Sequence, residues 1–139
     1  IDGHRGMTDV AGLLLLRVQA RDHASTVMNV TAGQTYTFSA SGWWVDAYIP
    51  CGAGGYSLPW LRPFEKDRIV PGAKWFCLIA LFDKSPDQPL EIGRGRRWDA
   101  TASGQLTFMA NDIPSMYWNN FGHLRLAVTW EPTQTGSLT

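Results

Sequence analysis

The sequence has no excess of charge of either sign. Twelve Lys and Arg residues balance twelve Asp and Glu residues, so the formal net charge is zero at neutral pH. Binding driven mainly by nucleic-acid phosphates or anionic lipids needs a basic surplus. The balance therefore argues against nucleic acid and membrane surfaces as partners. One local basic run, Arg94-Gly95-Arg96-Arg97, is predicted to be a solvated turn.

Cysteine and long hydrophobic runs are also scarce. Cys51 and Cys77 are the two cysteines, and one pair does not make a disulfide framework. Cys77 lies in an apolar run and is predicted to be a buried small hydrophobe, while a bridge between the two stays open. Leu13 to Leu16 form an apolar cluster that is far too short to span a bilayer and lacks the flanks of a secretory signal. We expect no insertion into a membrane.

No stretch longer than two turns has helical periodicity, and the dominant period is two. Side chains that alternate between apolar and polar predict strands with one buried face. The continuously apolar run 76–82 predicts a strand covered on both faces. With turn residues between them, these runs predict an all-β, single-domain antiparallel β-sandwich, with 1–10 and 131–139 as tail or linker. The predicted strands lie near residues 14–20, 26–30, 36–40, 76–82, 106–110 and 124–130.

Tryptophan is abundant, with seven residues in 139. Sugar-binding proteins use exposed indoles because a flat aromatic face matches the C–H face of a pyranose ring. Trp43 and Trp44 are adjacent, so on a strand they point to opposite faces. We expect one of them in the core and the other at the surface.

Polar side chains gather in the segment 111–120, which reads NDIPSMYWNN and separates two predicted strands. Calcium binds six to eight oxygen donors from carboxylates, amides, backbone carbonyls and water. Asp112 supplies charge, and Asn119 and Asn120 supply neutral oxygens. Zinc would need His or Cys ligands. The composition favours calcium, although Asn and Asp are also ordinary turn formers and the segment could be only a long hairpin loop.

The pattern Asn111-Asp112-Ile113-Pro114-x-x-Tyr117-x-Asn119-Asn120-x-Gly122 resembles the calcium loop of the PA-I type galactophilic lectins of bacteria. The segments 32–43, 97–98 and 104–107 are similar to other parts of that family. The resemblance implies a β-sandwich in which one calcium ion holds two neighbouring hydroxyls of galactose. It also implies a calcium shell built from the side chains of Asp112, Asn119 and Asn120 and the backbone carbonyls of Met116 and Asp46.

The same resemblance implies which residues contact the sugar. The family's pocket wall has a His-Pro-x-Gln stretch that grips the primary hydroxyl, and here Arg62-Pro63-Phe64-Glu65 stands in its place. Trp118 replaces a glycine of the family loop. The implied sugar-binding residues are Asp112, Ile113, Asn119, Arg62, Glu65 and Trp118.

The sequence therefore predicts a calcium-dependent lectin that binds galactosides or related glycans and is not an enzyme. Lectins of this kind usually gain strength by forming oligomers, so that several sites engage one glycan surface, but nothing in the sequence fixes a homo-oligomer. The sequence leaves the localisation open, and action outside the cell or at its surface fits a lectin. One alternative is a structural or partner-binding β-sandwich domain of a larger protein. A further alternative is a glycoside hydrolase that uses Glu65 and Asp112 as an acid/base pair.

Overall fold

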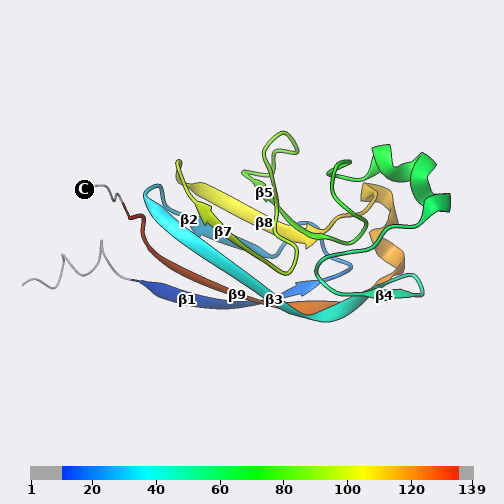
Figure 1. Cartoon of the computed structure of the whole chain (residues 1–139), viewed down its shortest axis with the longest axis horizontal. Helices are drawn as coiled ribbons and strands as arrows, with labels where there is room; N and C mark the ends of the chain where they lie inside the picture. Colours follow the sequence, from blue (N-terminus) through cyan, green and yellow to red (C-terminus); the bar gives the residue numbers. More distant parts are fainter. Residues whose placement is uncertain (1–10, 135–139) are drawn as a thin grey trace, which may run out of the picture.

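Two antiparallel β-sheets pack face to face in the computed structural model, which describes residues 11–134 (Figure 1). This arrangement confirms the predicted all-β sandwich. The first sheet has the order β1-β9-β3-β4, and β7 also pairs with β3. The second sheet has the order β2-β8-β5-β6. Across these residues, the structure has no helix long and apolar enough to cross a membrane.

The first sheet is built on two long strands, β3 (Gln34–Asp46) and β9 (Asn120–Pro132), which pair along their whole length from Gln34 opposite Pro132 to Asp46 opposite Asn120. The other three strands add to this pair. They are β1 (Gly12–Gln19) beside β9, and β7 (Gly95–Asp99) and β4 (Ile49–Cys51) beside β3.

The second sheet has its longest strand, β8 (Gly104–Ala110), near its centre. β8 lies between β2 (Val27–Val30) and β5 (Leu78–Phe82), and β6 (Pro89–Glu91) forms the outer edge. The alternating burial along β2 and much of β3 and β9 follows the side-chain period of two. For 106–110 the prediction of a single buried face is wrong, because every residue from Leu106 to Ala110 of β8 is buried and Met109 packs with Ile79 in a separate cluster from the main core.

The core lies between the two sheets and contains their inward-facing side chains. Phe38 of β3 meets Phe108 of β8 edge to face, with ring centroids 6.0 Å apart. Trp44 packs against Phe76 in the same manner at 5.6 Å. Trp44 is fully buried, whereas the neighbouring Trp43 is 65% exposed, as the predicted opposite orientation of the two indoles requires.

A smaller apolar cluster lies on the outer face of the second sheet. It joins Cys77, Ile79 and Met109 with Ile69 and Val70 of the preceding segment. Because Leu78 and Ala80 point into the main core, β5 is buried on both faces. This confirms the prediction for the run 76–82. Cys77 is buried as predicted, and both cysteines are free thiols.

Several elements differ from the sequence prediction. The basic run 94–97 is exposed but enters strand β7 instead of forming a turn, because Arg96 and Arg97 pair with β3. Glu131 and Pro132 are part of β9, and the backbone N–H of Thr133 donates to the Gly33 carbonyl, so these residues are not a tail. The predicted tail at 1–10 and the end of the second one, 135–139, lie outside the described residues.

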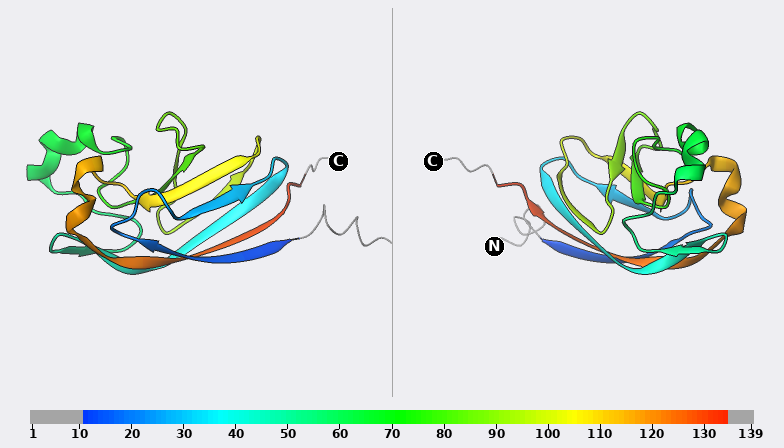
Figure 2. Two further views of the ribbon diagram at one scale, coloured as in Figure 1. Left: turned by 180° about the vertical axis from the view of Figure 1, so that it is seen from behind. Right: turned by 45° about the vertical axis from the view of Figure 1, so that its right-hand side comes forward.

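Two 3-10 helices, η1 (Pro59–Asp67) and η2 (Pro114–Asn119), were not predicted. Each begins with a proline, whose fixed φ suits the first position of a helix. Both helices and the β3–β4 hairpin lie at one end of the sandwich, as two views agree (Figures 1 and 2). The start of β1 and the end of β9 lie at the opposite end.

Candidate functional site

The segment 111–122 connects β8 to β9 at the end of the sandwich that carries η1, as the sequence predicted. Asn120 begins β9 directly opposite Asp46, which ends β3. Asp112 is placed beside them by a hydrogen bond, since the side-chain amide of Asn120 donates to its carboxylate over 3.0 Å. Residues that are far apart in sequence thus converge on one small region.

Asn111 holds the loop to the rest of the protein. Its side-chain N–H groups donate to the carbonyls of Val70, Ala73 and Lys74 at 2.9–3.1 Å, and its side-chain oxygen accepts from the N–H of Val70 at 2.9 Å. The side chain is completely buried. All of its hydrogen-bonding capacity is used within the protein, so it anchors the 69–75 segment and is not free to bind a ligand.

Asn120 is buried as fully as Asn111 but leaves one atom unpaired. Its amide nitrogen donates to the carbonyl of Ala20 and to the carboxylate of Asp112, both over 3.0 Å. Both partners are acceptors, so the nitrogen must face them, and the amide oxygen must point elsewhere. That oxygen is buried and has no hydrogen-bond partner among the described residues.

The neighbouring Asn119 has the same feature. Its side-chain oxygen is also buried without a partner within the described chain. Its backbone carbonyl accepts from the N–H of Ala47, which ties the end of η2 to the β3–β4 hairpin. An unpaired buried polar atom costs about 1–3 kcal/mol of folding free energy. Two such oxygens on adjacent residues, one of which is hydrogen-bonded to a carboxylate, therefore indicate a candidate site for a ligand, such as a cation, that binds oxygen donors.

Two carboxylates face this region. Burial raises the pKa of Asp112, and the negative charge of Asp46 raises it further, while hydrogen bonds from Asn120 and Ile113 act in the opposite direction. Burial also raises the pKa of Asp46, whose carboxylate accepts a hydrogen bond from the hydroxyl of Tyr56. The ionised form of each carboxyl group is therefore less favourable than in water, and a bound cation would offset that difference in free energy.

Gly122 closes the motif for a steric reason. Its φ is +83°, in the left-handed region that favours glycine. An added Cβ would lie 3.3 Å from the Cα of Trp44 on the neighbouring strand. The glycine therefore allows β9 to begin close against β3, which is what brings Asn120 opposite Asp46.

A cavity of about 340 Å³ opens beside the two carboxylates. It is lined by Asp46 and Asp112 together with five apolar side chains, which are Leu61, Phe64, Trp75, Ile113 and Met116. Tyr117 lies behind the site, buried and stacked on His23 with ring centroids 4.2 Å apart, and its hydroxyl donates to the carbonyl of Ala110.

The structure brings together most of the predicted site residues. Asp112, Asn119, Asn120 and Asp46 gather at the ends of β3 and β9, and Ile113 and Met116 line the adjoining cavity. Asp46 lines the cavity, and the sequence predicted a role for its backbone carbonyl. The carbonyl roles of Asp46 and Met116 stay predictions.

Three of the predicted sugar-binding residues lie elsewhere. Arg62 is exposed, and Glu65 lies near Arg68, with their charged groups 3.9 Å apart. The lining residues are instead Leu61 and Phe64, because a 3-10 helix has three residues per turn and places positions i and i+3 on one face. Trp118 is exposed and lies outside the lining. Glu65 is not among the residues that line this cavity with Asp112, so the lining gives no support to the acid/base pair of a glycoside hydrolase.

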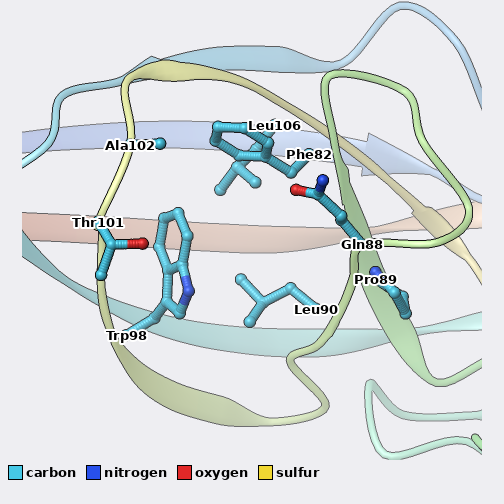
Figure 3. Close-up of a pocket in the computed structure, with 8 residues that line it drawn as sticks. All are labelled: Phe82, Gln88, Pro89, Leu90, Trp98, Thr101, Ala102 and Leu106. Carbon is cyan, nitrogen blue, oxygen red and sulfur yellow. The ribbon is translucent and has the colours of Figure 1, made fainter.

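A second cavity, of about 200 Å³, opens elsewhere on the sandwich between β6 and β7 (Figure 3). The indole of Trp98 forms one wall, and the side chains of Thr101 and Gln88 lie at its sides. Its lining residues carry no charge.

Among the described residues, no group of three or more His, Cys, Asp and Glu side chains could hold a metal ion. A cation site in this part of the chain would therefore depend on amide and backbone oxygens as well as carboxylates.

The sequence matches no protein-family model, and no curated protein sequence resembles it significantly. Among solved structures, the chain is similar to the N-terminal domain of EclA, described as a PllA-like lectin. The TM-score is 0.63 at 22% identity, over 86% of this chain and 98% of that one. This similarity confirms a lectin-like β-sandwich fold. The similarity to PliG of Aeromonas hydrophila, a periplasmic inhibitor of g-type lysozyme, has a TM-score of 0.38 at 10% identity and supports no inference. It covers 91% of this chain and 90% of that one.

Proposed function

We propose that this chain is a calcium-dependent carbohydrate-binding protein, a lectin, that recognises galactose or a related sugar through two neighbouring hydroxyls. The observation that carries the proposal is the pair of buried side-chain oxygens of Asn119 and Asn120 that have no hydrogen-bond partner within residues 11–134, with the amide of Asn120 bonded to the carboxylate of Asp112. The fold shared with a PllA-like lectin domain supports the same function.

The donor set fits calcium. Asp112 and Asp46 would supply negative charge, and Asn119 and Asn120 would supply neutral oxygens, all of which are hard donors that calcium prefers. Backbone carbonyls, including that of Met116, and water would complete the shell. When bound, the ion would offer coordination positions to vicinal hydroxyls, which take the place of water.

The chain's own residues would do the rest of the work. Tyr56 holds the Asp46 carboxylate in place, and Asn120 holds that of Asp112 through its amide nitrogen. Asn111 fixes the segment that follows η1 against the loop, which would hold the proposed ligands in place before the ion binds. Such preorganisation lowers the entropic cost of binding.

Thermal unfolding with calcium, without it and with a chelator tests the metal site. We expect calcium to raise Tm and the chelator to reverse the effect, because ligands that bind the folded state stabilise it. Retention on a galactose resin that is lost with the chelator then tests sugar binding. A Tm that does not respond to calcium would contradict the proposal. A calcium response without retention on any sugar resin would instead favour a structural or partner-binding domain that has kept the metal loop.

A further inference from the structure

The cavity beside the two carboxylates is lined mostly by hydrocarbon. Asp46 and Asp112 are the carboxylate residues among its described lining residues. The other five lining side chains carry no hydroxyl, amide or guanidinium, and their one hydrogen-bond donor, the indole N–H of Trp75, is buried. A sugar that reaches this cavity therefore meets two carboxylates and otherwise hydrocarbon.

The apolar wall follows from the geometry of η1. Leu61 and Phe64 are three residues apart and share one face of the 3-10 helix, while the polar Arg62 and Glu65 belong to the next face. Arg68 is buried, stacks over Trp75 with its guanidinium 5.0 Å from the ring centroid, and donates to the carbonyl of Pro71. The guanidinium of Arg68 thus contacts Trp75 and Pro71, and Glu65 lies beside it, with the two charged groups 3.9 Å apart.

Part of the wall is open to solvent before any ligand binds. Phe64 is 51% exposed and Met116 is 36% exposed. A ligand that covers these side chains with its own hydrocarbon would gain from the removal of apolar surface from water. A ligand hydroxyl in the same place would lose its hydrogen bonds to water without gaining new ones.

We infer that the sugar recognised here carries an apolar substituent next to the hydroxyls that bind the cation, namely a ring methyl group in place of a hydroxymethyl group. The inference rests on the proposed function and names the ligand class for that site. The cavity is large enough for this, since a cavity of about 150 Å³ accommodates benzene and this one measures about 340 Å³. The inferred ligand differs from the one that the sequence predicted, in which Arg62 and Glu65 would bind a primary hydroxyl of the sugar.

A matched pair of sugars tests the inference in the presence of calcium by titration calorimetry. D-galactose is compared with 6-deoxy-D-galactose, which keeps the vicinal hydroxyls and replaces only the hydroxymethyl group by a methyl group. We expect the 6-deoxy sugar to bind about tenfold or more tightly, the scale on which hydrophobic pockets discriminate.

Variants of the wall assign the preference to named residues. Phe64→Gln and Leu61→Gln should reduce the preference several-fold while leaving the calcium-induced rise in Tm intact, which also shows that each variant is folded. Trp60→Gln is the matched control, because Trp60 lies on the same helix and is exposed but does not line the cavity. It should leave the preference unchanged.

The outcomes separate this inference from the proposed function. A calcium response with the two sugars bound equally, or with D-galactose bound more tightly, overturns the inference and leaves the lectin assignment intact. An unchanged preference in both wall variants also overturns it. Absence of a calcium response in the wild-type chain overturns the proposed function itself.

Discussion

The side-chain amide of Asn120 donates to the carboxylate of Asp112 over 3.0 Å, and the same amide turns its oxygen into the interior without a partner in the described chain. The relationship fixes the orientation of both groups. The carboxylate is held in place, and a neutral oxygen donor is made available beside it. The predictions below test what this arrangement is for.

Asp112→Asn should remove the calcium-dependent stabilisation. The amide has the shape of the carboxylate but lacks its charge, which calcium requires. In the wild-type chain, calcium at 100 times its Kd should add about 2.7 kcal/mol to the free energy of unfolding. Differential scanning calorimetry with and without calcium measures the difference. Asp87→Asn, which changes an exposed carboxylate in the turn between β5 and β6, is the control and should keep the full response. A calcium response in Asp112→Asn equal to that of the wild type would place the ion elsewhere.

Asn111→Ala should destabilise the protein by roughly 2–4 kcal/mol. The change removes four hydrogen bonds and leaves the carbonyls of Val70, Ala73 and Lys74 without the donor that they share. Urea unfolding in the absence of calcium measures the loss. Asn29→Ala, at an exposed position of β2, should change the free energy of unfolding by less than about 0.5 kcal/mol. Equal effects of the two variants would show that Asn111 does not anchor the loop.

The effect of calcium on stability should decline as the pH falls, and the decline should begin above the ordinary carboxyl pKa of 3.8. Burial raises the pKa of Asp46 and Asp112, so protons compete with the cation at higher pH than usual. Without calcium the sign is opposite. The folded state binds these protons more tightly than the unfolded state, so the stability that they contribute is lost as the pH rises through the raised pKa values.

Melting curves with and without calcium between pH 4 and pH 8 test this prediction. The gap between the two Tm values should widen as the pH increases. A gap that stays constant down to pH 4 would mean that the two carboxylates do not hold the ion.

The two thiols should react slowly in the folded protein. Burial raises the pKa of Cys51 to about 12 and that of Cys77 to about 11, from an ordinary value of 9.0. At pH 8 the thiolate fraction of Cys77 should fall about a hundredfold, and that of Cys51 further. Alkylation by iodoacetamide, followed by mass spectrometry, should label both residues slowly in buffer and rapidly in denaturant. Labelling at the same rate in both conditions would show that the thiols are accessible and ordinary.

The sequence by itself determined the sandwich and the loop. Alternating apolar residues in 36–40 and 124–130 predict strands with one buried face, because successive side chains of a strand point in opposite directions. The residues 106–110 alternate in the same way, but their strand is buried on both faces, because the packing of the segment 69–73 over the second sheet is a tertiary contact. The same rule separated Trp43 from Trp44. The polar composition of 111–120 marked the candidate site, because few side-chain types bind hard cations.

Only the tertiary structure decided how the loop is used. Asn111 and Asn120 are the same residue type, nine positions apart, yet one is saturated with hydrogen bonds and the other leaves an oxygen free. That difference depends on which backbone groups reach each amide from Ala20 and from 70–74, which no local pattern encodes. The lining of the cavity likewise depends on the helical form of η1. Its repeat of three residues places Leu61 and Phe64 at the cavity, whereas the comparison of sequence positions had predicted their neighbours Arg62 and Glu65.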